Sequence, residues 1–313
     1  MDTRARLSRA LSAPVLFCRH ANRLYHRRLG RRQYNEAGVD PFDADWDTLV
    51  VLDACRYDMF ERQSDLPGRL ERRQSRASTT VEFLRATVDG RDLRDTVYVT
   101  ANPQLYQHRA EIDADFAAVV DVWSGEGWDD DHGTVLPETV TEAARRAAER
   151  HPHKRLVVHY MQPHYPFLGA ETAFEGGDFT DADGGHENVW VQRLRGDIDV
   201  SREEIWALYE DNLDRVLPHV ERLLSALDGR TVVTADHGNM VGERAFPIPF
   251  REWGHPRGIY TPELVEVPWL VHEDGLRREI RRAAPGSQDE STDRDASPTD
   301  AVADRLRDLG YAE

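Results

Sequence analysis

Residues 231–243 read T-V-V-T-A-D-H-G-N-M-V-G-E, and this stretch decides the fold. A short β-branched run follows Gly229, a typical end signal for the preceding helix, and stops at Asp236, His237 and Gly238. The pattern predicts a buried parallel strand, and ligands of open α/β sheets bind beyond the carboxyl ends of such strands. We therefore interpret Asp236 and His237 as ligands of a divalent metal such as zinc or manganese. The alternative is that Asp236 caps the next turn and His237 is merely exposed.

A second strand that ends in a carboxylate is predicted at residues 49–52, inside W-D-T-L-V-V-L-D-A-C-R-Y-D (46–58). The continuous apolar run is typical of a central parallel strand, and it stops at Asp53, with Arg56 in the following turn. Two strands that each deliver a carboxylate to one edge of a sheet can share an ion. The alternative is that Asp53 caps the segment that follows. Another D-H-G, at 131–133, has no apolar strand before it, and we predict a loop there.

Hydroxyl groups cluster at Ser78, Thr79 and Thr80, directly before a short amphipathic pattern that predicts a helix. The local interpretation is a helix cap, with Glu82 near the third helical position. The functional interpretation uses the same geometry, because a hydroxyl at a helix N-terminus lies near backbone N–H groups that favour an alkoxide and a bound anion. The sequence leaves both interpretations open.

Two histidines stand in constrained loops. His164 lies between two prolines in M-Q-P-H-Y-P-F, just after an apolar strand predicted at 154–160, and His255 lies in W-G-H-P. Neither histidine belongs to an apolar helix stripe, although a satisfied structural histidine is the alternative for each. We expect both to face the metal from the substrate side.

Strands and helices alternate along the chain, which predicts an α/β fold with a doubly wound, mostly parallel central sheet and helices on both faces. Further strands are expected at 95–103 and 265–271, and helices at 137–150 and from Ser201, where a capping box precedes a leucine-rich stripe that Pro218 should kink or break. The expected organisation is a basic N-terminal arm (1–44), an α/β domain (45–284), and a polar linker with a short closing helix (285–313).

The composition excludes several classes of protein. The formal net charge is −17 and Lys154 is the sole lysine, which is typical of a protein from very high salt and argues against nucleic-acid binding. No apolar run reaches the length of a membrane span, and residues 11–18 lack a cleavage site for export. Two distant cysteines form no disulfide framework, so we expect a cytoplasmic protein in which Cys55 is structural.

The N-terminal arm is the basic part of this acidic protein. Leucines and valines interleave with its arginines at near-helical spacing. The favoured interpretation is an arm that packs on its own acidic domain or is disordered, and the alternative is peripheral contact with an anionic membrane. The arginines are Arg4, Arg6, Arg9, Arg19, Arg23, Arg27, Arg28, Arg31 and Arg32.

Five motifs together resemble the alkaline phosphatase superfamily, in its sulfatase-like branch. They are L-V-V-L-D-A-C-R-Y-D, S-T-T-V-E-F, P-H-Y-P-F, T-A-D-H-G-N-M-V-G-E and G-H-P-R-G-I-Y-T-P-E-L-V-E-V-P-W-L, and they span residues 45–275. The resemblance implies that Asp53, Asp236 and His237 bind a divalent metal, with zinc or manganese favoured and calcium or magnesium allowed. It also implies that His164 contacts the transferred group and that His255 contacts the metal or the leaving oxygen.

The nucleophile is the weakest match. Ser78 fits the spacing best, as nucleophile and metal ligand, and Thr79 and Thr80 stay open. The formylglycine motifs of true sulfatases, C-x-P-S-R and C-x-A-x-R, do not occur in the chain, so a Ser or Thr alkoxide and phosphoryl chemistry are favoured. We also expect Arg56 to stabilise the charge that develops on the transferred group.

The resulting prediction is a metal-dependent hydrolase or transferase. Its substrate would be a phosphate or sulfate ester or diester on a small molecule, a glycan or a lipid. Two alternatives are a non-catalytic relative that binds a glycan or a partner, and a phosphoglycerate-mutase-like enzyme with two metals.

Overall fold

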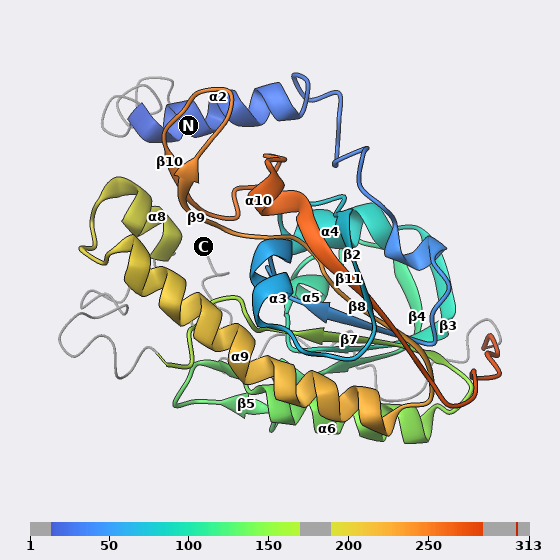
Figure 1. Ribbon diagram of the computed structural model, residues 1–313. Coiled ribbons are helices and arrows are strands. Elements are labelled where there is room, and N and C mark those ends of the chain that lie inside the picture. Colours follow the sequence, from blue (N-terminus) through green and yellow to red (C-terminus); the bar gives the residue numbers. More distant parts are fainter. Residues whose placement is uncertain (1–13, 170–188, 284–304, 306–313) are drawn as a thin grey trace.

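The computed structural model describes residues 14–169, 189–283 and 305, and it is built around a seven-stranded sheet (Figure 1). The strand order is β2-β11-β8-β1-β7-β3-β4. Every neighbouring pair in the part β8-β1-β7-β3-β4 is parallel, whereas β11 is antiparallel to both β8 and β2. The strands are β1 (Thr48–Leu52), β2 (Arg69–Gln74), β3 (Arg91–Thr100), β4 (Ala114–Asp121), β7 (Arg155–Tyr160), β8 (Gly229–Ala235) and β11 (Glu266–Asp274). The predicted mostly parallel central sheet is confirmed.

Helices cover both faces of this sheet, as the alternation of side chains requires. Val50 and Leu52 of β1 join the core beneath α3 (Tyr57–Gln63), α6 (Pro137–Arg150) and α9 (Arg202–Ala226). Leu49 and Val51 point to the other face and pack with residues of α4 (Thr80–Thr87) and α5 (Gln104–Gln107). The five residues of β1 are buried, which explains its continuous apolar sequence.

Smaller elements complete the structure. They are α2 (Pro14–His26), β5 (Trp128–Asp129), β6 (Thr134–Val135), α8 (Val189–Arg195), β9 (Met240–Arg244), β10 (Arg251–Gly254), α10 (Pro262–Val265) and two short 3₁₀ helices, Pro41–Asp43 and Val122–Ser124. β9 pairs with β10, and α2 lies beside this hairpin (Figure 1). The D-H-G at 131–133 lies in the turn between β5 and β6, as expected.

The prediction that Pro218 breaks the long helix is wrong, because α9 continues through it for 25 residues. The capping box of Ser201 and Glu204 is present at its N-terminus, and a buried stripe of ten side chains holds the helix against the sheet and α6. Pro218 removes one backbone hydrogen bond, and the packing on both sides of it outweighs that loss.

The predicted linker and closing helix at 285–313 lie outside the described residues, except for Arg305. No helix in the described part of the chain has both the length and the apolar character needed to cross a bilayer.

Candidate metal centre

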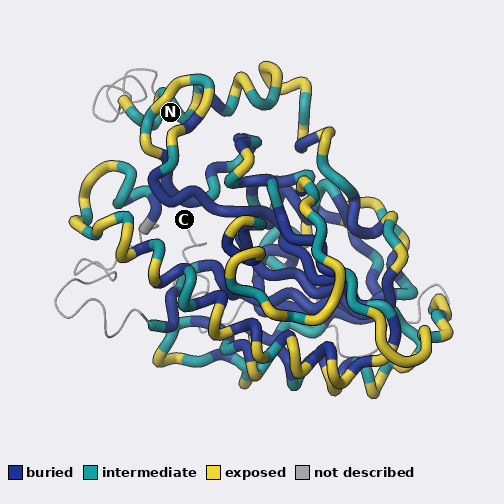
Figure 2. Tube along the Cα trace, viewed as in Figure 1, coloured by how far each residue is buried: buried dark blue, intermediate teal, exposed yellow. Residues whose placement is uncertain are grey.

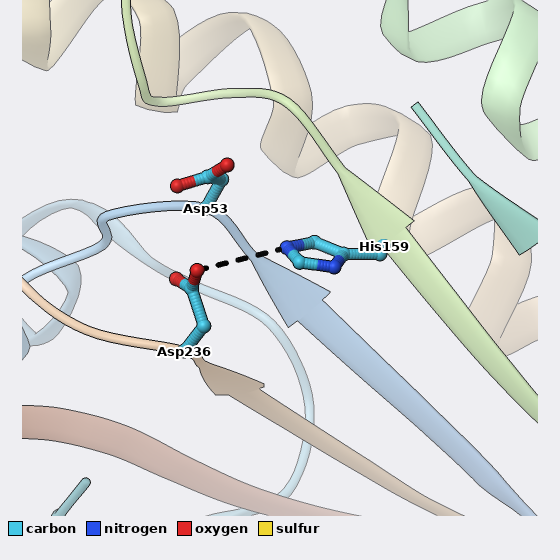
Figure 3. Close-up of side chains that lie close together, drawn as sticks. All are labelled: Asp53, His159 and Asp236. Carbon is cyan, nitrogen blue, oxygen red and sulfur yellow. Dashed lines mark ion pairs between the residues drawn. The ribbon is translucent and has the colours of Figure 1, made fainter. Parts of the chain in front are cut away.

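The carboxyl ends of neighbouring strands bring Asp53, Asp236 and His159 together (Figure 3). Asp53 follows β1 and Asp236 follows β8, and the register aligns the last residues of these two strands. His159 lies in β7, level with Val51 of β1, which places it on the same face as Asp53. One ligand atom from each of the three side chains lies within 4.8 Å of the others, and all three residues are completely buried.

Each carboxylate has one oxygen bound by the protein and one left bare. Asp236 Oδ1 accepts hydrogen bonds from the amides of Ala54 (3.0 Å) and His237 (2.8 Å), and Asp53 Oδ2 accepts one from the Asn102 side chain. Ala54 has a φ of 58°, so a tight turn after β1 aims its amide at Asp236. Within the described residues, Asp53 Oδ1 and Asp236 Oδ2 have no hydrogen-bond partner.

His159 is a residue that the sequence interpretation missed. Its Nδ1 lies 2.7 Å from the hydroxyl of Tyr98, and its Nε2 points at Asp236 Oδ2 from 3.9 Å. In the described structure this Nε2 is also without a hydrogen-bond partner. The signal in the sequence is a single polar residue inside the apolar run L-V-V-H-Y, whereas His164 lies beyond the strand.

His237 and Thr80 lie next to the bare oxygens. His237 Nε2 is 3.6 Å from Asp53 Oδ1 and 3.4 Å from Asp236 Oδ2, and its Nδ1–H donates to the carbonyl of Gly238 at 2.8 Å. That hydrogen bond leaves the lone pair of Nε2 directed into the cluster. The hydroxyl of Thr80, the first residue of α4, lies 3.4 Å from the same Nε2.

His164 and His255 reach the cluster from the loops after β7 and β10. Their Nε2 atoms are 2.8 Å apart, and the ring of His255 lies 4.7 Å from that of His237, centroid to centroid. His164 Nδ1–H donates to the carbonyl of Tyr165. His164 Nε2 is then the acceptor in the His164–His255 contact, and His255 Nε2 carries the proton.

Burial governs the electrostatics of this cluster. It raises the pKa of Asp53 well above the usual range, and the Asp236 carboxylate raises it further. Burial opposes ionisation of Asp236 too, but His237, His159 and the Ala54 amide outweigh it and lower the pKa of Asp236. Burial lowers the pKa of His159 and of His164 to about 4. The imidazoles of His159 and His164 are therefore neutral at neutral pH, beside two carboxyl groups that a cation would hold ionised.

The hydroxyl that contacts the cluster is that of Thr80, whereas the sequence favoured Ser78. Ser78 Oγ bonds to Glu82 Oε2 (3.1 Å) and the Pro256 carbonyl (3.2 Å) and accepts from the Gly258 amide (2.8 Å). Ser78 precedes α4, so its side chain points toward the 256–258 loop. Thr79 is the helix cap and accepts from the amide of Glu82.

Arg56 has a different environment from the one expected. Its guanidinium donates to both oxygens of Asp58 (2.8 and 2.7 Å) and to Glu243 (2.7 Å), and it lies 4.8 Å from the ring centre of Trp206. These carboxylates compensate its charge, so Arg56 links the turn after β1 to β9. Cys55 is buried in the core beside it.

The residues present fit a divalent transition metal. One ligand atom each of Asp53, Asp236 and His159 lies within 4.8 Å of the others, and His237 Nε2 lies beside the two bare carboxylate oxygens. Nitrogen–oxygen donor sets of this kind suit zinc or manganese better than calcium or magnesium. Leaving such atoms buried without partners is unfavourable, and a cation would satisfy them together.

Comparison with solved structures gives one consistent likeness. The integral membrane lipooligosaccharide phosphoethanolamine transferase A (EptA) from Neisseria meningitidis matches at 12% identity and a TM-score of 0.44, over 72% of this chain and 47% of that one. The C-terminal periplasmic domain of EcEptC from Escherichia coli, in complex with Zn, matches at 12% and 0.42, over 76% and 75%. A 2-O GAG sulfatase matches at 11% and 0.46, over 75% and 65%.

The chain is similar to these structures in fold alone. It spans about half the length of the integral membrane transferase. No family model and no curated protein matches it. At these identities and TM-scores the likeness concerns the fold, so the chemistry below depends on the residues of the site.

Proposed function

We propose that the protein is a metal-dependent transferase or hydrolase of phosphate esters or diesters, with Thr80 as its nucleophile. The supporting observation is the position of the Thr80 hydroxyl, at the first residue of α4 and 3.4 Å from His237 Nε2. Ser78 is bonded elsewhere and Thr79 caps the helix. A sulfate ester is the less favoured substrate because the formylglycine motifs do not occur.

Asp53, Asp236 and His237 would hold the metal, with His159 as a fourth donor. Once bound, a metal in this position supplies charge that lowers the pKa of a nearby hydroxyl and stabilises an anionic substrate. Thr80 Oγ would form a bond to phosphorus as the bond to the leaving oxygen breaks. The N-terminus of α4 favours the anionic oxygens of the transferred group.

The histidine pair handles the proton that this reaction moves. The proton that the Thr80 hydroxyl loses would pass to His255, and the imidazolium so formed would donate it to the leaving oxygen, with His164 orienting His255 through their 2.8 Å contact. Water or an acceptor alcohol would then release the group from Thr80, as hydrolysis or transfer respectively. The acceptor would be a small molecule or a glycan- or lipid-linked group.

Three variants test the nucleophile on a generic phosphodiester with added zinc or manganese. Thr80→Ala should lose turnover by roughly 10²–10⁴-fold or more, Thr80→Ser should keep part of it, and Thr79→Ala should be nearly silent. Intact mass spectrometry after rapid acid quench should detect a phosphoryl adduct in the wild type and none in Thr80→Ala. Full turnover in Thr80→Ala, or an adduct that persists in it, would refute the assignment.

Metal analysis separates the two alternatives. A protein that purifies without metal and has no activity that depends on Asp236 would be a non-catalytic relative. Two equivalents of metal would favour a phosphoglycerate-mutase-like centre, for which His164 and His255 would be the additional ligands.

A further inference from the structure

Exposed apolar side chains gather on one side of the molecule. Across the described ranges, seven large hydrophobic residues are exposed, and six of them form a patch on α2, the turn after it and the β9–β10 connection. We call these six the apolar patch. They are Phe17, Leu24, Tyr25, Leu29, Phe246 and Ile248, and the seventh exposed residue is Leu276. The rings of Tyr25 and Phe246 lie 5.6 Å apart, so the two parts of the patch are continuous.

Helix α2 presents this patch because its polar side faces the protein. Asn22 is completely buried, and its side chain exchanges two hydrogen bonds with the backbone of Ile248 (3.0 and 2.8 Å). Arg19 forms an ion pair with the buried Glu252 of β10, and His26 bonds to the Phe246 carbonyl at 2.9 Å. The opposite side of the helix is exposed (Figure 2). A soluble surface helix normally has the reverse arrangement.

Positive charge surrounds the apolar patch. From residue 14 to residue 35, the part of this segment that the structure describes, the chain has no Asp or Glu and six arginines, although the formal net charge of the full chain is −17. Arg28 and Arg31 are exposed at the end of α2. Arg23 lies over Gly258, and within the described structure the Nε atoms of Arg23 and Arg257 have no hydrogen-bond partner. Arg19 and Arg32 are paired with Glu252 and Glu36, so this side of the molecule combines apolar side chains with more arginines than acidic partners.

We propose that α2 and the β9–β10 connection dock onto the surface of an anionic phospholipid membrane. Interleaved apolar and arginine side chains match the acyl boundary and the head groups of such a surface. A second copy of the chain is a poorer partner. In a symmetric pair the arginines would face each other, and the rest of the described surface offers just Leu276 as an exposed large apolar residue.

Docking in this way places the candidate metal centre next to the membrane. The stems of Arg23 and Arg27 lie against Gly258, three residues from His255, and Arg19 bonds to Glu252, three residues before it. A phosphoester carried by a lipid could then reach the centre from the docked side. This extension rests on the proposed function, whereas the docking itself does not.

Vesicle flotation tests the docking with the full chain. We would compare vesicles of phosphatidylcholine alone with vesicles that contain about a third phosphatidylglycerol, in 0.1 M and 1 M KCl. Two variants carry double changes, Phe17→Ser with Tyr25→Ser and Arg28→Glu with Arg31→Glu. The matched controls are Leu276→Ser and Arg282→Glu, which change a more exposed leucine and an exposed arginine near the amino ends of the parallel strands. Circular dichroism checks that each variant is folded.

We expect the wild type and both controls to float with anionic vesicles and to bind neutral ones at least about tenfold less tightly. Each double variant should bind anionic vesicles about tenfold or more less tightly than the wild type. In 1 M KCl the wild type should bind them more weakly but still bind, because salt screens the charges and leaves the apolar contribution. Equal binding by the double variants and the controls would overturn the proposal. So would failure of the wild type to bind, or a wild-type dimer that the patch changes convert to monomer while vesicles have no effect.

Discussion

Replacing Asp53 by asparagine should stabilise the metal-free protein while removing the metal. Asp53 and Asp236 are two completely buried carboxyl groups whose bare oxygens belong to one cluster within 4.8 Å. Asparagine has nearly the same shape, and its carbonyl oxygen can still accept the hydrogen bond that Asn102 donates. The substitution therefore removes one buried negative charge and little else.

The size of the effect follows from the distance between the charges. Two like charges about 5 Å apart repel by roughly 3 kcal/mol at an effective dielectric constant of about 20. Burial, together with Asp236, raises the pKa of Asp53, so part of this repulsion is already relieved by protonation. We expect Asp53→Asn to increase the free energy of unfolding of the metal-free protein by about 1–3 kcal/mol at neutral pH.

The stability difference between Asp53→Asn and the wild type should depend on pH in one direction. The folded state holds the proton of Asp53 more tightly than the unfolded state, so the Asp53 carboxyl makes the metal-free protein less stable as pH rises above about 4. Asparagine does not titrate, and the histidines are common to both proteins. The stability advantage of the variant should therefore grow between pH 5 and pH 8.

Urea unfolding after treatment with a chelator measures both free energies, and elemental analysis measures the bound metal. Asp47→Asn is the control, because this buried carboxylate is paired with Arg277 and accepts from the Arg230 amide, so its replacement should destabilise by about 1–3 kcal/mol. A metal-free Asp53→Asn protein that is less stable than the wild type, or one that retains the metal, would refute the reasoning.

Four further predictions concern other parts of the molecule. His255→Ala should lower turnover by roughly 10²–10⁴-fold, and unchanged turnover would exclude it as the proton donor. Glu252→Gln breaks the buried ion pair with Arg19, so limited proteolysis should cut α2 sooner than in the wild type; equal rates would contradict that role. Pro218→Ala should raise the free energy of unfolding by about 1 kcal/mol or more, and with it the urea midpoint, since it restores a hydrogen bond inside α9; a lower midpoint would contradict this. Burial raises the pKa of the Cys55 thiol, so a thiol reagent should modify it only after unfolding.

Local sequence patterns predicted most of the sheet. The continuous apolar runs of β1, β7 and β8 occur because both faces of these strands are covered, and the capping box fixed the start of α9. The same runs showed that Asp53 and Asp236 follow parallel strands. The fold class and the grouping of these carboxylates could therefore be inferred from periodicity and strand ends alone.

Contacts between distant segments decided the rest. The sequence could not show that His159 of β7 faces the cluster, because the face that a side chain occupies depends on register with β1. Nor could it choose among Ser78, Thr79 and Thr80, because Ser78 and Thr79 precede the helix that begins at Thr80 and their side chains point in different directions. The partners of Arg56 lie up to 187 residues away in the chain.

The sequence by itself determined most strands of the sheet, the long helices and the residue types at the strand ends, because these depend on neighbours a few positions apart. The tertiary structure alone decided which buried polar atoms lie close together without hydrogen-bond partners, and which side of α2 faces solvent. Asn22 and Arg19 turn inward because their hydrogen-bond partners lie on the β9–β10 connection and β10, more than 200 residues later. Burying those polar groups against partners outweighs burying Phe17 and Leu24, and no local pattern contains that balance.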